Sequence, residues 1–144
     1  MLVSPTKTMT LPHARNPQLT RDGSTLYCLG SNDEIGSAWL SGDLIRRDVA
    51  SGAEQAIGRN LMPLDLSADG RFMVGFQAHD PAGYRDNLDP TLMILDLTTG
   101  RLDRIATRTD GVNVETTAHV SNSGNTVVFW NYYLGQFALK KWTR

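Results

Sequence analysis

The sequence predicts an all-β fold built from repeated four-stranded antiparallel sheets, and three observations carry this prediction. A Gly-containing turn between two apolar segments occurs three times, at residues 19–27, 66–74 and 120–128. An Asp-x-x-x-Gly element follows the first two turns, at residues 48–52 and 96–100. The turn positions 22, 69 and 123 are 47 and 54 residues apart, and the second elements are 48 residues apart. A four-stranded unit that repeats every ~50 residues is typical of a β-propeller blade.

The first turn of each repeat is expected to join an inner strand, A, to a second strand, B. Asp-Gly favours a tight hairpin because a primed turn needs positive φ, which Gly adopts at little cost. The A strands are predicted to end near Thr20, Ser67 and Ser121. The B strands are apolar almost throughout, as expected of strands covered on both faces by neighbouring blades. They are Thr25–Leu29, Arg71–Phe76 and Thr126–Trp130.

The Asp-x-x-x-Gly element is expected to close a second hairpin, between strands C and D. Gly supplies the left-handed residue of this turn, and Asp accepts backbone N–H groups within it. The predicted C strands are Leu44–Val49, Leu92–Leu97 and Phe137–Trp142, and the predicted D strands are Glu54–Ile57 and Leu102–Ala106. The third repeat shows no such element and no D strand. The sequence therefore predicts one domain, residues 1–144, with about two and three-quarter blades at residues 16–60, 61–110 and 111–144.

A β-sandwich also has short strands and regular turns, but it does not require one turn chemistry to recur at a fixed period. The partial propeller is therefore preferred. Closed propellers have about 4–8 blades, which leaves two hypotheses for completing this one. In the first, the chain is a piece of a longer propeller that supplies the other blades. In the second, copies of the chain form a homo-oligomeric ring, and the N-terminal residues 1–15, especially Val3–Thr10, supply the missing outer strand of a neighbouring blade.

Charge and composition exclude several classes of partner. Lys and Arg number 14 and Asp and Glu number 15, without a basic run. Nucleic acids and anionic membrane surfaces both attract concentrated positive charge, so neither is expected as a partner. No apolar run reaches the ~18 residues of a membrane span, and the first residues lack the apolar stretch of a signal peptide. We expect a cytoplasmic location for the chain as written, and a periplasmic one if it is a piece of a secreted precursor.

Two of the repeated elements resemble those of TolB-type β-propellers, whose usual form is Ser-Pro-Asp-Gly followed later by Asp-Leu-x-Thr-Gly. Residues 67–70 (Ser-Ala-Asp-Gly) and 96–100 (Asp-Leu-Thr-Thr-Gly) match best, residues 20–23 are close, and residues 121–124 lack both Pro and Asp. The resemblance covers roughly residues 16–142. It is specific for the blade, whereas the function varies, because such repeats occur in binding proteins, peptidase propellers and lyases.

Within this group, residues 67–71 and 92–100 most resemble the oligogalacturonate lyases. This resemblance implies β-elimination on short pectin fragments, with a divalent metal such as manganese bound by histidines. His119 directly precedes Val120 in a predicted A strand and does not match a ligand position of that family. Outside this alternative no cofactor is expected.

The connections between strands B and C carry the candidate ligand-binding residues. In a propeller these connections share one face with the D–A connections, and long insertions there are typical of a binding surface. Residues 30–40 and 77–90 form long connections, and residues 131–135 form a short one. Tyr and Trp faces stack on sugar rings, and Arg pairs with carboxylates; a solvated loop with aromatics covering the blade edge is the alternative. The candidates are Trp39, Tyr84, Arg85, Asp86, Trp130, Tyr132 and Tyr133.

The sequence assigns no catalytic residue. His13, His79 and His119 are the candidate metal ligands, but no His-x-x-x-His spacing supports a site, and three unrelated histidines are the alternative interpretation. No Gly-x-Ser-x-Gly element occurs, and Cys28 lies in an apolar run where a buried structural thiol is expected.

Two functions remain for this sequence. The first is a non-catalytic scaffold that binds an oligosaccharide or a protein through its B–C loop face. The alternative is a fragment of a carbohydrate-active propeller enzyme of the oligogalacturonate lyase type.

Overall fold

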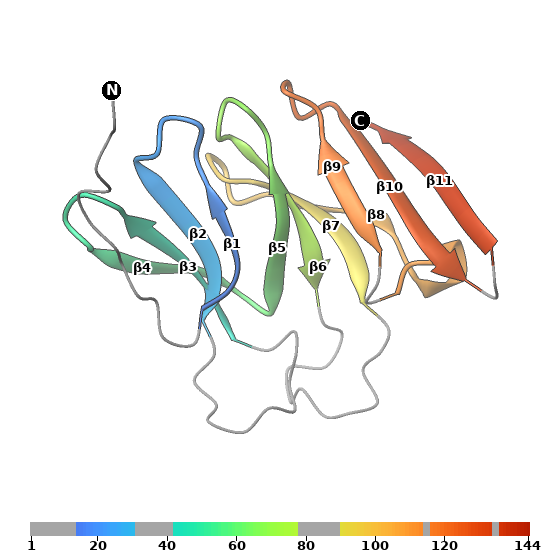
Figure 1. Ribbon diagram of the computed structural model, residues 1–144, viewed down its shortest axis with the longest axis horizontal. Coiled ribbons are helices and arrows are strands. Elements are labelled where there is room, and N and C mark those ends of the chain that lie inside the picture. Colours follow the sequence, from blue (N-terminus) through green and yellow to red (C-terminus); the bar gives the residue numbers. More distant parts are fainter. Residues whose placement is uncertain (1–13, 31–41, 78–89, 114–115, 134–135) are drawn as a thin grey trace, which may run out of the picture.

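The computed structural model describes residues 14–30, 42–77, 90–113, 116–133 and 136–144, and the side chains of residues 131–137 lie outside this description. Every element in these ranges is a strand except one short 3-10 helix, η1 (Figure 1). In chain order they are β1 (Ala14–Leu19), β2 (Thr25–Gly30), β3 (Asp43–Asp48), β4 (Glu54–Arg59), β5 (Leu61–Leu66), β6 (Phe72–Gln77), β7 (Thr91–Asp96), β8 (Leu102–Ala106), η1 (Arg108–Asp110), β9 (Thr117–Val120), β10 (Thr126–Tyr133) and β11 (Gln136–Thr143). The predicted all-β class is confirmed. Within these ranges, no helix has the length and hydropathy needed to cross a bilayer.

The strands form three antiparallel sheets that stand side by side as blades (Figure 1). The first blade has the order β1-β2-β3-β4, the second β5-β6-β7-β8, and the third, in its described part, β9-β10-β11. The inner strands lie next to one another from blade to blade, because β1 contacts β5 and β5 contacts β9. This is the arrangement of strands around a propeller axis. The structure is therefore a partial β-propeller, as the repeat predicted.

The turns between strands A and B are four-residue loops, and their turn type differs from the primed turn that was expected of Asp-Gly. Thr20 donates its N–H to the Thr25 carbonyl at 2.9 Å, and Gly23 donates to the Thr20 carbonyl at 2.9 Å. The same pair of bonds closes the second turn at Ser67 and the third at Ser121. In each turn the Gly has a φ between 70° and 73°. The reason is that a loop built on a type I turn needs one left-handed residue, which the Gly supplies, while the preceding Asp or Ser keeps an ordinary φ.

A hydroxyl group at the end of each A strand fixes the turn. Each hydroxyl accepts the N–H of the residue five positions later, at 2.9–3.1 Å: these are Thr20, Ser67 and Ser121. The first two also donate to the turn carboxylate, at 2.7 Å to Asp22 and 2.5 Å to Asp69. In the third turn Ser123 stands in place of Asp, 3.5 Å from the Ser121 hydroxyl. The same hairpin therefore forms with either Asp or Ser at this position.

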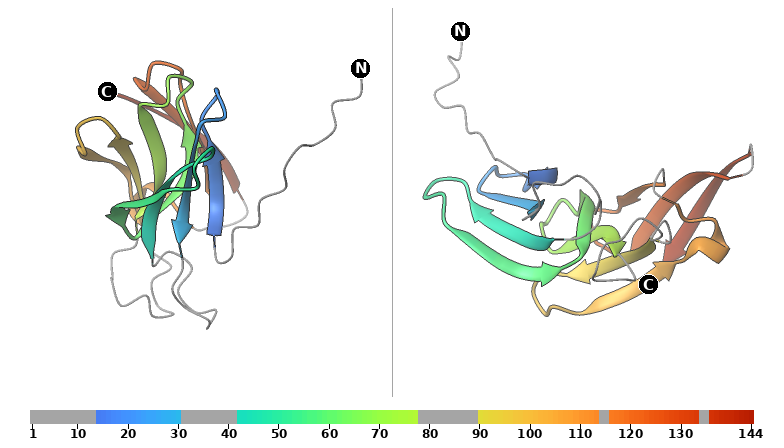
Figure 2. Two further views of the ribbon diagram at one scale, coloured as in Figure 1. Left: turned by 90° about the vertical axis from the view of Figure 1, so that its left-hand side faces the viewer. Right: turned by 90° about the horizontal axis from the view of Figure 1, so that it is seen from below.

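The second blade is covered on both faces, as its apolar B and C strands predicted. Met73, Met93 and Leu95 pack against the first blade, in one core with Tyr27 and Leu44. The alternate residues of the same strands pack against the third blade: they are Phe72, Val74, Phe76, Leu92 and Ile94, in one core with Val127 and Phe129. Figure 2 shows the second blade lying between the other two. Among the described residues, each of the outer blades has a neighbouring blade on one face only.

Several contacts besides the apolar core join the second blade to the third. Asp65 in β5 accepts the N–H of Val120 in β9 at 2.9 Å. The Arg144 guanidinium pairs with Asp103 of β8 at 2.8 Å and lies 4.9 Å from the centre of the Phe72 ring. Gly124 in the third turn lies so close to this ring that a Cβ atom there would overlap it. The third turn is therefore part of the interface between the blades.

The Asp-x-x-x-Gly turns have the geometry predicted for them. Gly52 and Gly100 have φ of 75° and 74°. Asp48 accepts the N–H of Ser51 at 2.7 Å in the first blade. Asp96 accepts the N–H groups of Thr98 and Thr99 in the second blade, at 2.9 and 3.3 Å, and it also pairs with Arg71 at 2.9 Å.

We expect Asp96→Asn to lower the urea midpoint of unfolding at neutral pH. The hydrogen bond from Arg71 is the main cause that holds the pKa of the Asp96 carboxyl at about 2, below its ordinary 3.8, and the turn N–H groups add to it. A carboxyl with a depressed pKa stabilises the fold above its ordinary pKa, and this contribution is lost as the pH falls through the folded value. The difference in urea midpoint between wild type and variant should therefore be largest at neutral pH and should shrink as the pH falls from about 4 towards about 2.

Asp48→Asn is the matched control, because Asp48 holds the same turn in the first blade mainly through Ser51 and, among the described residues, accepts no hydrogen bond from an arginine side chain. A midpoint difference for Asp96→Asn that stays constant down to pH 2 would show that its ionisation does not matter.

Candidate functional site

The B and C strands of the first two blades end at the same edge of the molecule. Gly30 pairs with Asp43 at the end of β2 and β3, and Gln77 pairs with Thr91 at the end of β6 and β7. The two long connections therefore leave and rejoin adjacent blades at this edge. Trp39, Tyr84, Arg85 and Asp86 belong to these connections and lie outside the described residues.

The third blade places one predicted ligand-binding side chain within the described structure. Trp130 lies in β10, one residue before the position equivalent to Gln77, and its side chain is 39% exposed. Tyr132 and Tyr133 belong to the same strand, but their side chains are outside the described residues. The loop face therefore remains a proposal.

The predicted histidines do not form a described metal site. His13 and His79 lie outside the described residues. His119 in β9 has its Nδ1 3.5 Å from the Asp65 carboxylate and is largely exposed. The ranges that the structure covers contain no group of three or more His, Cys, Asp or Glu side chains able to hold a metal ion. These residues alone do not fit the histidine-bound manganese that the lyase resemblance implied.

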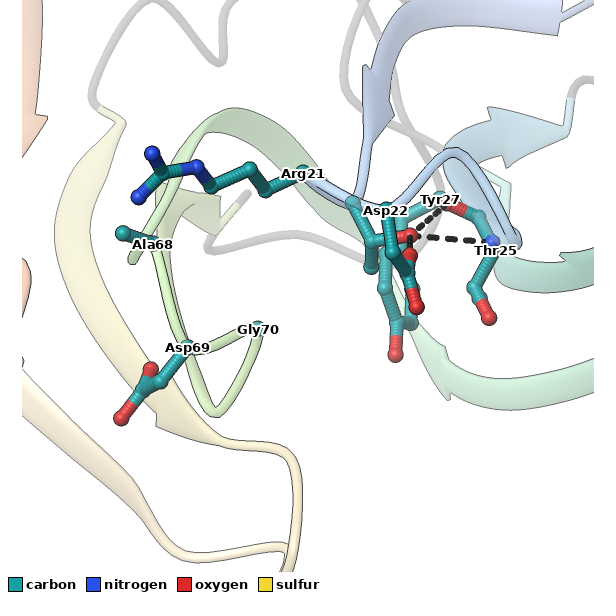
Figure 3. Close-up of a pocket in the computed structure, with 8 residues that line it drawn as sticks. Arg21, Asp22, Thr25, Tyr27, Ala68, Asp69 and Gly70 are labelled. Carbon is teal, nitrogen blue, oxygen red and sulfur yellow. Dashed lines mark hydrogen bonds between the residues drawn. The ribbon is translucent and has the colours of Figure 1, made fainter.

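A pocket lies at the opposite edge, between the A–B turns of the first and second blades (Figure 3). Its volume is about 480 Å³, within the range of pockets that take small ligands. The first blade and the second blade each contribute a turn to its wall, and the lining residues are Thr20, Arg21, Asp22, Thr25, Tyr27, Ala68, Asp69 and Gly70. In Figure 3 the Arg21 side chain extends from the first turn towards Ala68 of the second.

The repeated turn network sets the electrostatics of this pocket. The Thr20 hydroxyl, followed by the Ser24 N–H and hydroxyl, lowers the pKa of the Asp22 carboxyl. The Ser67 hydroxyl and the Arg71 N–H lower the pKa of Asp69 in the same way. Both carboxylates are therefore ionised at neutral pH. With the Arg21 guanidinium, the lining carries two negative charges and one positive charge.

Tyr27 gives the pocket an aromatic component. Its ring is buried against the second blade in the core between the two blades, and burial raises the pKa of its hydroxyl. The hydroxyl is therefore neutral at physiological pH and can donate or accept a hydrogen bond. The pocket combines ionised groups at its rim with an aromatic ring, which suits binding of a polar ligand.

Cys28 is not placed for nucleophilic chemistry. Cys28 is buried, and burial is the main cause that raises the pKa of its thiol, so the reactive thiolate is disfavoured. This agrees with the structural role expected from its apolar neighbours.

Sequence reasoning looked for the site on the B–C loops and missed the pocket between the A–B turns. A signal for it was present, because Asp22 and Asp69 occupy the same position in consecutive repeats. Equivalent positions in adjacent blades lie side by side around a propeller axis. The periodicity could therefore have placed the two carboxylates near one another, although not the space between them.

Comparison with known proteins places this fold. The chain superimposes on the crystal structure of TolB from Acinetobacter baumannii with a TM-score of 0.66 and 16% identity, over 90% of this chain and 29% of that one. The β-propeller domain of the Trilobed protease from Pyrococcus furiosus gives a TM-score of 0.62 at 9% identity, over 92% and 43% of the two chains. The structure of oligogalacturonate lyase in complex with manganese gives a TM-score of 0.57 at 16% identity, over 87% of this chain and 36% of that one.

The chain therefore has a TolB-like β-propeller fold, as its repeat predicted. It spans less than half the length of each of these three structures, so other blades or partners are needed to complete a propeller. No family model matches the sequence, and no curated protein matches it.

Proposed function

We propose that this chain is a ligand-binding and protein-interaction scaffold that receives a positively charged side chain of its partner between the first two A–B turns. The observation that supports this most directly is the pocket shared by two blades, with Asp22 and Asp69 at its rim and Tyr27 in its wall. Its position on the fixed turns of stacked sheets favours a preformed site, since rigid elements hold binding groups with little loss of entropy.

The charge balance supports a cationic ligand. Within the described residues, Oδ2 of Asp69 accepts no hydrogen bond, because Ser67 and Arg71 both donate to Oδ1. The two carboxylates exceed the single Arg21 guanidinium by one charge. A lysine or arginine side chain would balance this charge and form a charge-assisted hydrogen bond with Asp69.

The peptide acetyl-Gly-Arg-Gly-amide tests the proposal, with its citrulline analogue as the neutral control of nearly the same shape. We expect the arginine peptide to shift the backbone NMR signals of Gly23 and Gly70, and the citrulline peptide to bind about tenfold more weakly, as expected for loss of one charged hydrogen bond.

The double variant Asp22→Ser, Asp69→Ser removes the negative charge and copies the third turn, which closes the same hairpin with Ser123. We expect it to fold and to lose the preference for arginine. Equal binding of the two peptides by the wild type, or an unchanged preference in the variant, would exclude a cation-selective pocket.

The loop edge supports a second candidate, because the ends of β2, β3, β6 and β7 bring the two long connections to adjacent blades. Here the ligand would be an acidic oligosaccharide, and trigalacturonate is the probe. Binding that is lost in Tyr84→Ala and Arg85→Ala would support this surface, and binding that both variants keep would contradict it. A manganese-dependent rise in the absorbance of unsaturated uronate would favour the lyase alternative instead.

A further inference from the structure

The exposed large apolar side chains of the described residues all lie on the two outer faces of the stack of blades. They are Leu19 at 56% exposure, Val128 at 37%, Trp130 at 39% and Leu139 at 75%. Leu19 belongs to the first blade, and the other three belong to the third. Their faces follow from the strand pairing, since directly opposed residues on antiparallel strands share a face.

The outer face of the third blade corresponds to the face of the first blade that the second blade covers, and to the face of the second blade that the third blade covers. Trp130 pairs with Leu139 across β10 and β11, and Val128 lies on the same face two residues away. Equivalent residues in the three blades have the same distance from the Gly of the A–B turn and the same cross-strand partner positions. The residues equivalent to Val128, Trp130 and Leu139 are buried in both other blades. These equivalents are Tyr27, Leu29 and Leu44 in the first blade and Val74, Phe76 and Leu92 in the second.

The outer face of the first blade is the complementary surface. Leu19 pairs with Leu26, and Cys28 pairs with Ile45, on the side turned away from the second blade. Leu19 is exposed on this side and Ile45 is half-buried, whereas Leu26 and Cys28 are already buried in the single chain. Their equivalents include Leu66, Met73 and Met93, which the second blade packs against the first. The outer face of the third blade thus carries the side chains that the next blade of a propeller would cover. The outer face of the first blade carries the side chains that would pack on the blade before it.

We infer that the outer face of the third blade binds the outer face of the first blade in a second copy of this chain. Because the two surfaces differ, the contact is head-to-tail, and two such contacts between two chains close a ring. Two copies bring six sheets together, from the three that the described residues form in each chain, and this number falls within the range of about 4–8 blades in closed propellers. Closure would cover the four exposed side chains and does not depend on the pocket between the turns.

The charged residues on these faces are compatible with such a contact. Lys141 pairs with Val128 and therefore lies on the outer face of the third blade. Its equivalent in the first blade is Arg46, an exposed residue beside Tyr27 at the rim of the interface with the second blade. A cation at this position is therefore tolerated between two packed blades. On the opposite surface Arg47 is already paired with Glu54 at 2.5 Å.

Light scattering on the purified chain over a range of micromolar concentrations tests the inference. We expect the wild type to have twice the 15.9 kDa chain mass. Leu139→Glu and Leu19→Glu each place a charge at an exposed position and should each give a folded monomer. Thr98→Glu adds the same charge to an exposed turn outside both faces, and should remain a dimer.

A mixture of the two monomeric variants gives the most specific test of head-to-tail contact. Leu19→Glu keeps an intact third blade and Leu139→Glu keeps an intact first blade, so one head-to-tail contact should re-form and give a heterodimer. A wild-type monomer at all concentrations would show that the face awaits another partner, such as further blades of a longer chain, and would overturn the inference. It would also be overturned by a dimer that Leu19→Glu leaves intact, which indicates contact between two third blades, or by open-ended aggregates.

Discussion

Gly124→Ala is expected to destabilise the chain by about 2–5 kcal/mol, because two independent costs meet at one residue. Gly124 has a φ of 71°, which costs an L-residue about 1–2 kcal/mol. Its missing Cβ would also overlap the Phe72 ring, and overpacking of this kind adds about 1–3 kcal/mol. The ring cannot move aside freely, because the guanidinium groups of Arg71 and Arg144 lie 4.8 and 4.9 Å from its centre.

Gly100→Ala separates the two costs. Gly100 has nearly the same φ, 74°, but no atom lies within 4 Å of the position that its Cβ would take. We expect this variant to lose only the conformational part, about 1–2 kcal/mol. Urea unfolding of both variants measures the difference. Equal losses would mean that the third turn does not pack against Phe72 as described.

Phe76→Ala is expected to cost about 3–5 kcal/mol, the usual range for deleting a fully buried aromatic ring. Phe76 is 1% exposed in the core between the second and third blades. Such a loss is a large part of the total stability of about 5–15 kcal/mol that domains have. Phe76→Leu keeps most of the apolar volume and should remain folded with a smaller loss, which allows a measurement if the alanine variant unfolds.

Trp130→Ala is the matched comparison, because Trp130 holds the equivalent position in the third blade but is 39% exposed. With no blade packed on it, we expect a loss of about 1–2 kcal/mol despite its larger ring. Both substitutions should be measured in the Leu19→Glu background, so that self-association does not contribute and the cross-strand partner of Trp130 is unchanged. A loss for Trp130→Ala as large as that for Phe76→Ala would mean that the outer face is covered within a single chain.

The repeat could be predicted from the sequence because its turns depend on local chemistry. The Gly at positions 23, 70 and 124 and the Ser or Thr hydroxyl that precedes each one are sufficient to predict three hairpins. The turn type was predicted wrongly, because Asp-Gly is compatible with both a two-residue primed turn and a longer loop with one left-handed residue. Only the backbone bonds between Thr20 and Thr25 distinguish the two.

Contacts between blades could not be predicted in the same way. The pairing of Arg144 with Asp103 joins residues 41 positions apart, and the hydrogen bond from the Val120 N–H to Asp65 spans 55 positions. Such contacts depend on the twist and spacing of whole sheets, which no local pattern encodes. The pocket could not be predicted for the same reason. The sequence predicts each of its two turns separately, but the space between them depends on how the two blades pack.

The position of the second blade between two apolar cores has a consequence for how the chain unfolds. The first and third blades bury apolar side chains chiefly against the second, so the energetic coupling in this stack runs between nearest neighbours, as it does in linear repeat proteins. In such a system the ends open at lower free energy than the centre. The amide protons of β6 and β7 then exchange with solvent only in the rarest openings, whereas those of β3 and β11 exchange in partial openings that leave the centre intact.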